Sequence, residues 1–418
     1  MIDAPTTRTR KFDYRGLYKK LERTLRAIER SADLDETLSA ILEGIVTEFR
    51  EDLGFVGGRL YRVLPDVIVL QMRCGKSGSV RPGLRIPRTY RPIQTVLEQG
   101  YVFMAADHPD FDPAVERDLE VQVFAAIAVG AEDPHIVSFT VEGPLEEERI
   151  LFSLNTIRHV INLKLEHQEL VDQILQARDI QMSLLPSAPP RFWAYDVAGR
   201  SIPAEAVGGD LFDYIPISDR ILGIAIADSS GHGLPAALQA RDVIIGLRMG
   251  LEEDLKIIRT VEKLNRVIHN SNLATKFISL FYAELERNGN FTYCNAGHPP
   301  ALLHQDGRFQ ALELGGMVLG PAPAAKYERG FVSLRPGDLV VLYTDGITEA
   351  GGPRGEEFGV ARLEEETRRL AARPAAEIVE GILAAAESFC GPEGPEDDRT
   401  VVVVKHPALT APPGGSGP

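Results

Sequence analysis

Apolar residues recur along this chain with two different periods, and the periods divide it into three regions. Between residues 15 and 145, helical spacing gives way to short apolar runs that predict strands. Residues 146–186 keep helical spacing and contain neither Gly nor Pro before Pro186. Residues 190–406 are rich in predicted strands, with helical stretches between them. The polar, basic residues 1–14 and the tail 407–418 are predicted to be disordered.

The first region predicts an α+β domain. Leu17, Leu21 and Leu25 make a helical stripe, and a second helix begins near Asp33, where Asp33 and Glu36 have capping-box spacing. The remaining pattern predicts a helix over 93–99 and strands over 55–63, 67–73, 101–105, 123–129 and 136–141.

The middle region predicts one long helix. Its apolar residues follow spacings of four and three, which is typical of a coiled coil and favours a homodimer through this helix. The seam consists of Ile150, Leu154, Ile157, Ile161, Val171, Leu175, Met182 and Leu185. Lys164, Gln168 and Arg178 interrupt it, so its register is adjustable. The alternative is a helix that packs on its own domain.

A hairpin with two aspartates opens the third region. An alternating run from Asp210 to Ile217 and an apolar run from Ile221 to Ala227 predict paired strands joined by Ser218-Asp219-Arg220. If Ile217 pairs with Ile221, counting outward places Asp210 opposite Asp228, with their Cβ atoms about 4.5–5.5 Å apart. Two carboxylates this close repel each other unless they share a proton or a cation.

The residues after Asp228 favour a cation. Ser229 to Gly233 form a backbone-rich turn, and a helix is predicted from Leu234. A carboxylate, main-chain oxygens and a helix start therefore meet at one point. Hard oxygen ligands of this kind suit Mg²⁺ or Mn²⁺.

Two further acidic positions repeat this placement. Asp345 follows the buried run 339–344, and Asp397-Asp398 precede the last predicted strand, 400–405. In an antiparallel sheet the start of one strand lies beside the end of its neighbour, so all these carboxylates are expected at one edge. Turn signals also predict a hairpin between 277–285 and 291–296, and another between 331–334 and 339–344.

Composition narrows the class of protein. The chain has 418 residues and a net charge of −15, which argues against nucleic acid or an anionic membrane as the main partner. The three cysteines, Cys74, Cys294 and Cys390, fit no metal or disulfide spacing and indicate a reducing compartment. No signal peptide or apolar run long enough for a membrane span is found, so a cytoplasmic location is expected.

Six ordered motifs in the third region carry a family resemblance: VGGDLFDY, ADSSGHG, NAGHPPALL, GDLVVLYTDGITEA, EFG and DDRTVVVV. They resemble the SpoIIE/RsbU-like branch of the metal-dependent PPM serine/threonine phosphatases, over about 190 to 406. The resemblance implies an αββα sandwich that binds two Mn²⁺ or Mg²⁺ ions.

The same resemblance implies roles for individual residues. Asp228 would bridge both ions, and the main-chain carbonyl of Ser229 would also bind metal. Asp345 and Asp397 would complete the protein ligands of one ion, and Asp210 would hold ligands or waters close by. The register between Asp397 and Asp398 is left open by one residue. His232, Asn295 and His298 are expected to be structural or pocket-lining.

The first region resembles a GAF domain in its order of elements and in its opening helix, LDETLSAILEGIVTEF. PAS-like and other small sensor folds share this outline. The resemblance implies a small-molecule or protein signal at this domain, and a ligand-free dimerisation module is the alternative.

Together the regions predict a sensor-regulated protein serine/threonine phosphatase. In this branch the substrate implied is a phosphorylated STAS-type anti-anti-sigma protein, and metal-activated water attacks its phosphoserine or phosphothreonine. A non-catalytic signalling scaffold and a two-metal phosphodiesterase are the alternatives.

Overall fold

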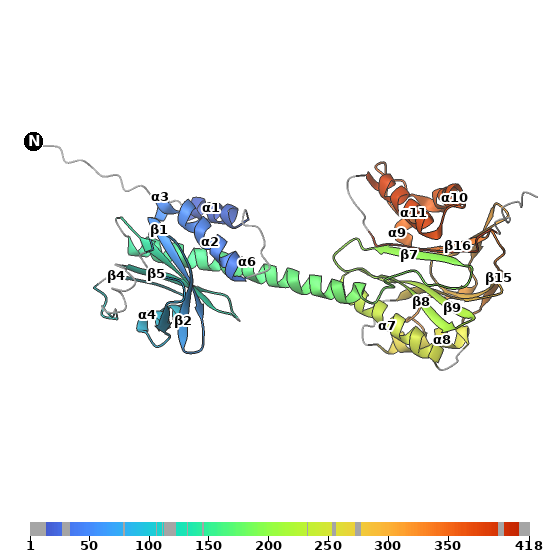
Figure 1. Ribbon diagram of the computed structural model, residues 1–418, viewed down its shortest axis with the longest axis horizontal. Coiled ribbons are helices and arrows are strands. Elements are labelled where there is room, and N and C mark those ends of the chain that lie inside the picture. The colour runs from blue at the N-terminus through green and yellow to red at the C-terminus, as the bar shows by residue number, and fades with distance from the viewer. Residues whose placement is uncertain are drawn as a thin grey trace, which may run out of the picture. The chain divides into compact units, whose positions relative to one another are not determined.

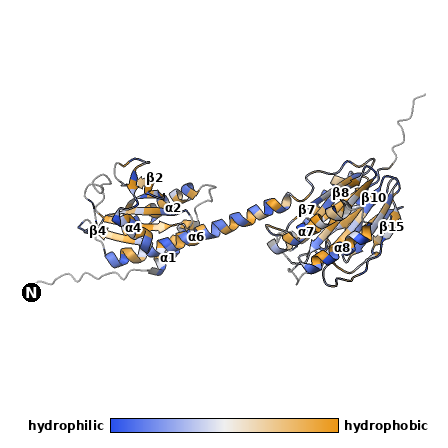
Figure 2. Cartoon of the chain, turned by 90° about the horizontal axis from the view of Figure 1, so that it is seen from below, coloured by the Kyte–Doolittle hydropathy of each residue, from blue (hydrophilic) through white to orange (hydrophobic). Residues whose placement is uncertain are grey.

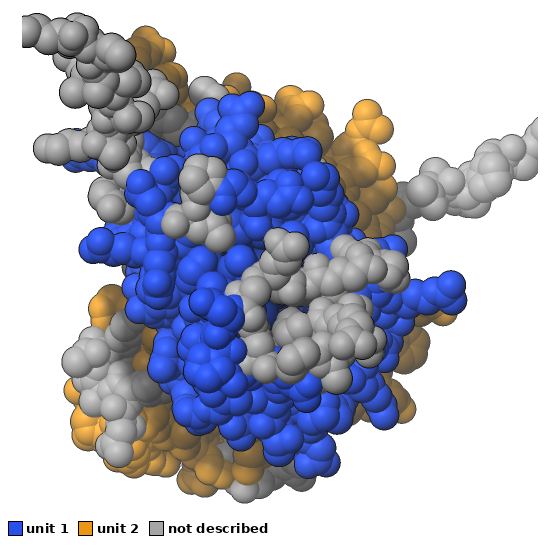
Figure 3. Space-filling model, turned by 90° about the vertical axis from the view of Figure 1, so that its left-hand side faces the viewer, with its two compact units in different colours: residues 1–171 blue, residues 172–418 orange. Residues whose placement is uncertain are grey.

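The computed structural model describes residues 14–26, 34–77, 80–105, 107–110, 112, 123–131, 133–143, 146–231, 233–252, 256–271, 277–391 and 397–408. The chain divides into two compact units, residues 1–171 and 172–418 (Figure 3). Apart from Tyr14, Pro407 and Ala408, the ends predicted to be disordered lie outside the described residues, and so does Asp33 of the expected capping box.

Unit 1 contains the α+β elements that the sequence predicts (Figure 1). Its helices are α1 (Tyr14–Arg26), α2 (Leu34–Glu48), α3 (Arg50–Leu53), α4 (Arg91–Gln99) and the first part of α6 (Glu147–Met182). Its strands are β1 (Phe55–Val63), β2 (Val67–Gly75), β3 (Arg85–Pro87), β4 (Tyr101–Ala105), β5 (Val123–Val129) and β6 (His135–Val141). The short strand β3 was not predicted.

The strands of unit 1 form an antiparallel sheet in the order β3-β2-β1-β6-β5-β4. Leu21 of α1, Ile41 of α2 and Leu154 of α6 are fully buried in one apolar core of this unit, together with Phe55 and Phe139 of the sheet. A second core gathers α4 and residues of alternate parity on the strands, such as Tyr61 and Ile136. Both faces of the sheet are therefore packed, as the period-two pattern requires.

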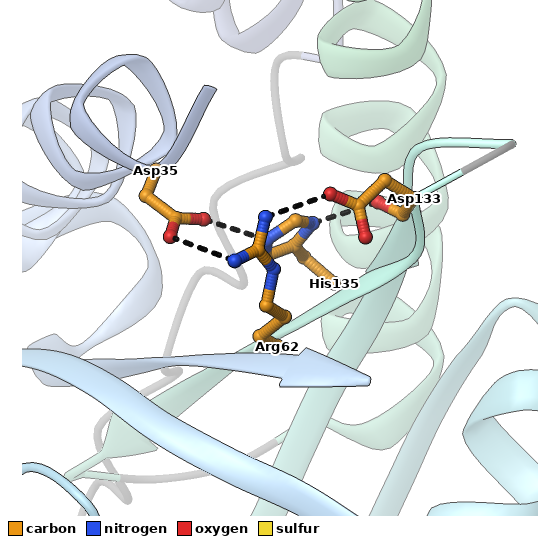
Figure 4. A network of polar contacts seen from close by, with 4 residues as sticks. All are labelled: Asp35, Arg62, Asp133 and His135. Atoms are coloured by element: carbon orange, nitrogen blue, oxygen red, sulfur yellow. Dashed lines mark hydrogen bonds and ion pairs between the residues drawn. The ribbon is translucent and has the colours of Figure 1, made fainter. Parts of the chain in front are cut away.

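A polar network joins α2 to the sheet of unit 1 (Figure 4). The ring nitrogens of the fully buried His135 lie 2.8 Å from the Asp35 carboxylate and 2.8 Å from the Asp133 carbonyl oxygen. Arg62 lies 3.0 Å from the Asp133 carboxylate and 3.9 Å from that of Asp35. The start of α2 is thereby tied to β1 and β6.

The long helix α6 corrects part of the sequence interpretation. Ile150, Leu154, Ile157 and Ile161 are buried in the core of unit 1, so they pack on their own domain and do not form an interchain seam. Farther along, hydrophobic and hydrophilic residues alternate on the helix (Figure 2), and Leu163, Leu170 and Ile174 are exposed. The predicted seam therefore fails in its first half.

Unit 2 is a sandwich of two sheets between helices. Its helices are α7 (Leu234–Glu252), α8 (Ile257–Asn270), α9 (Asp345–Thr348), α10 (Gly359–Leu370) and α11 (Ala375–Cys390). Its strands are β7 (Asp196–Ile202), β8 (Asp210–Ser218), β9 (Ile221–Ser229), β10 (Ile278–Glu286), β11 (Asn290–Ala296), β12 (Ala301–Gln305), β13 (Arg308–Leu312), β14 (Gly315–Gly316), β15 (Gly330–Ser333), β16 (Leu339–Tyr343) and β17 (Arg399–Lys405).

One sheet has the order β14-β11-β10-β9-β8, with β15 beside β11, and the other has the order β13-β12-β16-β17-β7. The inner faces pack together through residues such as Phe212, Phe281 and Val402. Helices α7 and α8 cover the outer face of the first sheet, and α9, α10 and α11 cover that of the second (Figure 1). This is the αββα arrangement that the family resemblance implies.

The predicted hairpin between 331–334 and 339–344 is wrong. Strand β15 pairs with β11 in the first sheet, whereas β16 pairs with β12 and β17 in the second. The Pro336-Gly337 turn therefore carries the chain from one sheet to the other. The hairpin between β10 and β11 is confirmed.

Among the described residues, no helix combines the length and the apolar character needed to cross a bilayer.

Candidate metal centre

The two aspartates of the opening hairpin face each other. Asp210 pairs with Asp228 in the β8–β9 ladder, as predicted. The predicted three-residue loop is wrong, because Ser218 pairs with Ile221 and the turn is Asp219-Arg220. A bulge between Pro216 and Ser218 takes up the extra residue, so the register at the aspartates is unchanged.

Ser229 lies at the end of β9 and is buried. Its hydroxyl donates a 2.8 Å hydrogen bond to the side-chain oxygen of Gln239 on α7, and its amide donates to the Gly209 carbonyl at 3.2 Å. These contacts fix the turn against both α7 and the residues before Asp210. His232, in the same turn, lies outside the described residues.

Asp345 reaches this region from the second sheet. It follows Thr344 at the end of β16 and opens the short helix α9, which was not predicted. The Thr344 hydroxyl donates to the Asp210 carboxylate at 2.7 Å and accepts from the Thr400 amide at 3.0 Å. Thr344 therefore joins the two sheets directly at the acidic edge.

The adjacent acids Asp397 and Asp398 occupy different environments. Asp398 is buried, and its carboxylate accepts hydrogen bonds from the amides of Ala204 (2.8 Å), Gly209 (2.5 Å) and Asp210 (3.3 Å). Asp397 is exposed, and its carboxylate accepts from the Asp398 amide at 2.8 Å. The charge of Asp397 also acts more strongly on Asp228 than that of Asp398 does. Asp398 therefore organises the main chain of residues 204–210, whereas Asp397 is exposed at this edge.

Burial and neighbouring negative charges raise the pKa of the two facing aspartates. Burial, followed by the charges of Asp345, Asp397, Asp398 and Glu349, raises the pKa of Asp228 to about 7. Burial, followed by the charge of Asp228, raises the pKa of Asp210 well above its ordinary value. The charges of Asp345 and Asp397 therefore act on Asp228, and the charge of Asp228 acts on Asp210.

A divalent cation fits the chemistry of this donor set. Buried and mutually repelling carboxylates are stabilised by a positive charge between them, and oxygen donors suit Mg²⁺ or Mn²⁺. Within the described part of the chain, however, no three His, Cys, Asp or Glu side chains are close enough to hold one ion.

A buried histidine stands beside this edge. The Nδ1 atom of His298 lies 2.8 Å from the hydroxyl of Ser279, whose residue pairs with Asp228 in the β9–β10 ladder. Burial lowers the pKa of His298 to about 3, and the nearby main chain of Tyr343 opposes this shift. The other ring nitrogen, Nε2, is buried and has no hydrogen-bond partner among the described residues. Asn295 holds the His298 main chain through two hydrogen bonds of 2.8 Å. The neutral imidazole thus contacts β10, the strand that pairs with β9 beside Asp228.

Sequence reasoning missed several residues of this region. In the sequence, Thr344 is an ordinary residue at the end of a predicted strand. Only the packing of the two sheets shows that its hydroxyl donates a hydrogen bond to Asp210. Glu349 is coupled to Asp345 because α9 brings them one turn apart, and the charge of Asp345 is the main cause that raises the pKa of Glu349. Buried Asp213, which forms a 2.9 Å ion pair with Arg248, was detectable from its place in the alternating run.

This chain is similar in sequence to known proteins. The profile of the family described as stage II sporulation protein E (SpoIIE) matches residues 218–407. The phosphoserine phosphatase RsbU of Bacillus subtilis (strain 168) is 31% identical over 244 residues, which cover 57% of this chain and 71% of RsbU. The phosphoserine phosphatase RsbP of the same organism is 28% identical over 149 residues, covering 34% of this chain and 37% of RsbP.

A solved structure supports the fold of unit 2. The SiaA-PP2C domain of Pseudomonas aeruginosa matches with a TM-score of 0.51 and 22% identity, covering 57% of this chain and 98% of that domain.

Proposed function

The chain belongs to the SpoIIE/RsbU-like family of PP2C-type, metal-dependent protein phosphatases, and we propose that it removes phosphate from phosphoserine or phosphothreonine of a regulatory protein under the control of its N-terminal unit. The observation that carries this proposal is the pair of buried Asp210 and partly buried Asp228, held opposite each other at an edge whose charges also include Asp345 and Asp397. A signalling scaffold without chemistry has no need to hold two repelling carboxylates opposite each other.

We propose the following roles for the residues at the acidic edge. Asp228, Asp345, Asp397 and the Ser229 carbonyl would hold two Mn²⁺ or Mg²⁺ ions, with Asp210 close by. When bound, two such ions would supply a water of lowered pKa, oriented for attack on phosphorus. Thr344 and Asp398 hold Asp210 and its neighbouring main chain in place through the hydrogen bonds described above.

We propose a STAS-type anti-anti-sigma protein as the substrate. The support is the family, together with the name phosphoserine phosphatase that two relatives carry. The net charge of −15 makes a nucleic-acid substrate unfavourable. We place this reaction in the cytoplasm, where such regulators act.

We further propose a homodimer through α6. Leu163, Leu170 and Ile174 are 52%, 58% and 48% exposed. Their spacings of seven and four place them on one helical stripe. This stripe lies one residue away from the predicted seam, whose first half is used inside unit 1. Pairing of two copies would cover these side chains.

We propose that unit 1 is a GAF-like input domain for a small-molecule or protein signal. The sheet of unit 1 is packed on both faces and shares one apolar core with α6. A conformational change in this unit would therefore be transmitted to α6. Screening of small molecules and proteins for binding to the full-length chain would identify the signal.

A substrate panel tests the proposed reaction class. Full-length protein with Mn²⁺ would be presented with phosphorylated STAS proteins, a phosphoserine peptide and a phosphodiester. Preference for a phosphorylated STAS protein supports the proposal, whereas hydrolysis of the diester alone would support a phosphodiesterase. Binding of a STAS protein without turnover would support a scaffold.

A further inference from the structure

The last turn of α6 contacts the main chain that leads into the acidic edge. Within unit 2, the side-chain amide of Gln181 donates a 2.5 Å hydrogen bond to the Gly208 carbonyl, and the Gly208 amide donates to the Gln181 side-chain oxygen at 3.2 Å. One side chain thus satisfies both polar groups of a single residue. A neutral carboxamide can do this because it carries a donor and an acceptor on the same planar group.

Gly208 and Gly209 lie against Asp398 and Ser229. A Cβ atom on Gly208 would lie 2.4 Å from the Asp398 carboxylate, and one on Gly209 would lie 2.7 Å from the Ser229 carbonyl oxygen. The Gly209 amide donates to Asp398, and the Gly209 carbonyl accepts from the Ser229 amide. A displacement of this glycine pair would therefore also move Asp210, Asp398 and Ser229.

The residues around Gln181 make it suited to transmit a displacement. From Asp172 to Ile180 the side chains of α6 are exposed or only partly buried. After Gln181, Leu184 and Leu185 pack against the apolar cores of unit 2. Gln181 therefore lies where the solvent-exposed part of α6 ends and the chain begins to pack on the sandwich of unit 2.

We propose that Gln181 is a positioning residue, which holds the Gly208–Gly209 turn and through it sets the placement of Asp210, Asp398 and Ser229. A rotation or shift of α6 acts on the acidic edge by making or releasing this contact. The route differs from the one through α7 that the Ser229–Gln239 bond offers. This inference rests on the proposed function, since the positioned residues belong to the proposed metal centre.

Three full-length variants test the proposal. Gln181→Ala removes both hydrogen bonds, and Gln181→Glu keeps the shape but loses the donor and places a charge near Asp398. Gln176→Ala, at an exposed position of the same helix, is the matched control. The measurements are amide exchange of the segment around Gly208 without metal, binding of Mn²⁺ alone, and phosphate release.

Both Gln181 variants should exchange the Gly208 segment faster and bind Mn²⁺ about tenfold more weakly, the loss typical of residues that support metal ligands. A role in packing alone would spare Gln181→Glu. Exchange and Mn²⁺ affinity equal to the Gln176→Ala control in both variants would overturn the inference. An unmodified protein that binds Mn²⁺ but releases no phosphate would instead overturn the proposed function.

A combined variant tests whether α6 acts through this contact. One alanine inserted after Gln173 turns the rest of the helix by about 100° relative to its start. The insertion should change kcat in the unmodified chain but add little when Gln181 is already alanine, because the contact is gone. Additive effects of the two changes would contradict transmission through Gln181.

Discussion

Asp210 and Asp228 lie directly opposite each other in an antiparallel ladder, and Asp210 is only 4% exposed. Their repulsion is relieved in part by the Thr344 hydroxyl, which donates to Asp210. The remaining strain has measurable consequences for the metal-free protein, because a buried carboxylate with a raised pKa makes stability depend on pH.

The metal-free protein should lose stability as pH rises toward neutrality. The pKa of Asp228 is about 7 when folded and about 4 when unfolded, so the folded state binds more protons between these values. This contribution is present below about pH 4 and is lost as pH rises through about 7. The free energy of unfolding would be measured with denaturant and a chelator for the wild type and for Asp228→Asn. Between pH 5 and 7.5 the wild type should lose stability relative to Asp228→Asn. A difference independent of pH would contradict the assigned environment.

Addition of one methyl group at Gly208 should disrupt the acidic edge. In Gly208→Ala the new Cβ would overlap the Asp398 carboxylate, and overpacking of this kind typically costs about 1–3 kcal/mol. We expect lower stability and weaker Mn²⁺ binding. Gly351→Ala, where a Cβ meets no atom within 4 Å, is the control and should stay within about 1 kcal/mol of the wild type. Equal behaviour of both variants would refute the close packing at Gly208.

His298 should support the metal centre without binding metal itself. Its imidazole contacts Ser279, beside Asp228, and lies near the main chain of Tyr343, two residues before Asp345. His298→Ala is expected to weaken Mn²⁺ binding about tenfold, as loss of an outer-shell partner typically does. His304→Ala, at a partly buried histidine of β12, should leave it unchanged. Titration with Mn²⁺ would measure the affinity of both variants, and equal affinities would exclude this role for His298.

The oligomeric state should depend on the exposed stripe of α6. Leu170→Glu combined with Ile174→Glu places charges where two copies would meet, so light scattering should report monomers. Ile157→Lys should instead unfold unit 1, because Ile157 is fully buried in its core. A wild-type monomer at tens of micromolar would rule out the proposed dimer.

Local patterns in the sequence were enough to predict the aspartate pair and most strands of unit 2, because buried strands and turn residues leave a clear period. The four layers of unit 2 were expected from the family resemblance and not from these patterns. The register at Asp210 and Asp228 was correct although the turn was not, since the bulge near Ile217 compensates for the shorter loop.

Contacts between distant segments were beyond such patterns. Nothing local to 331–344 says that β15 and β16 join different sheets. The adjacent Asp397 and Asp398 differ because amides of 204–210 surround only one of them, a contact across more than 180 residues of chain. The Gln181–Gly208 contact likewise required the position of α6 relative to β8 within unit 2.

Phosphate release from a phosphoserine protein by the full-length chain is the most direct test of a metal-dependent phosphatase built on Asp228. With Mn²⁺ present, the wild type and the exposed-turn control Asp219→Asn should turn over, and a chelator should stop both. Asp228→Asn, folded by circular dichroism, should lose at least about a hundredfold in kcat, or about 2.7 kcal/mol of transition-state stabilisation. A folded Asp228→Asn protein that works within about twofold of the wild type would contradict the account.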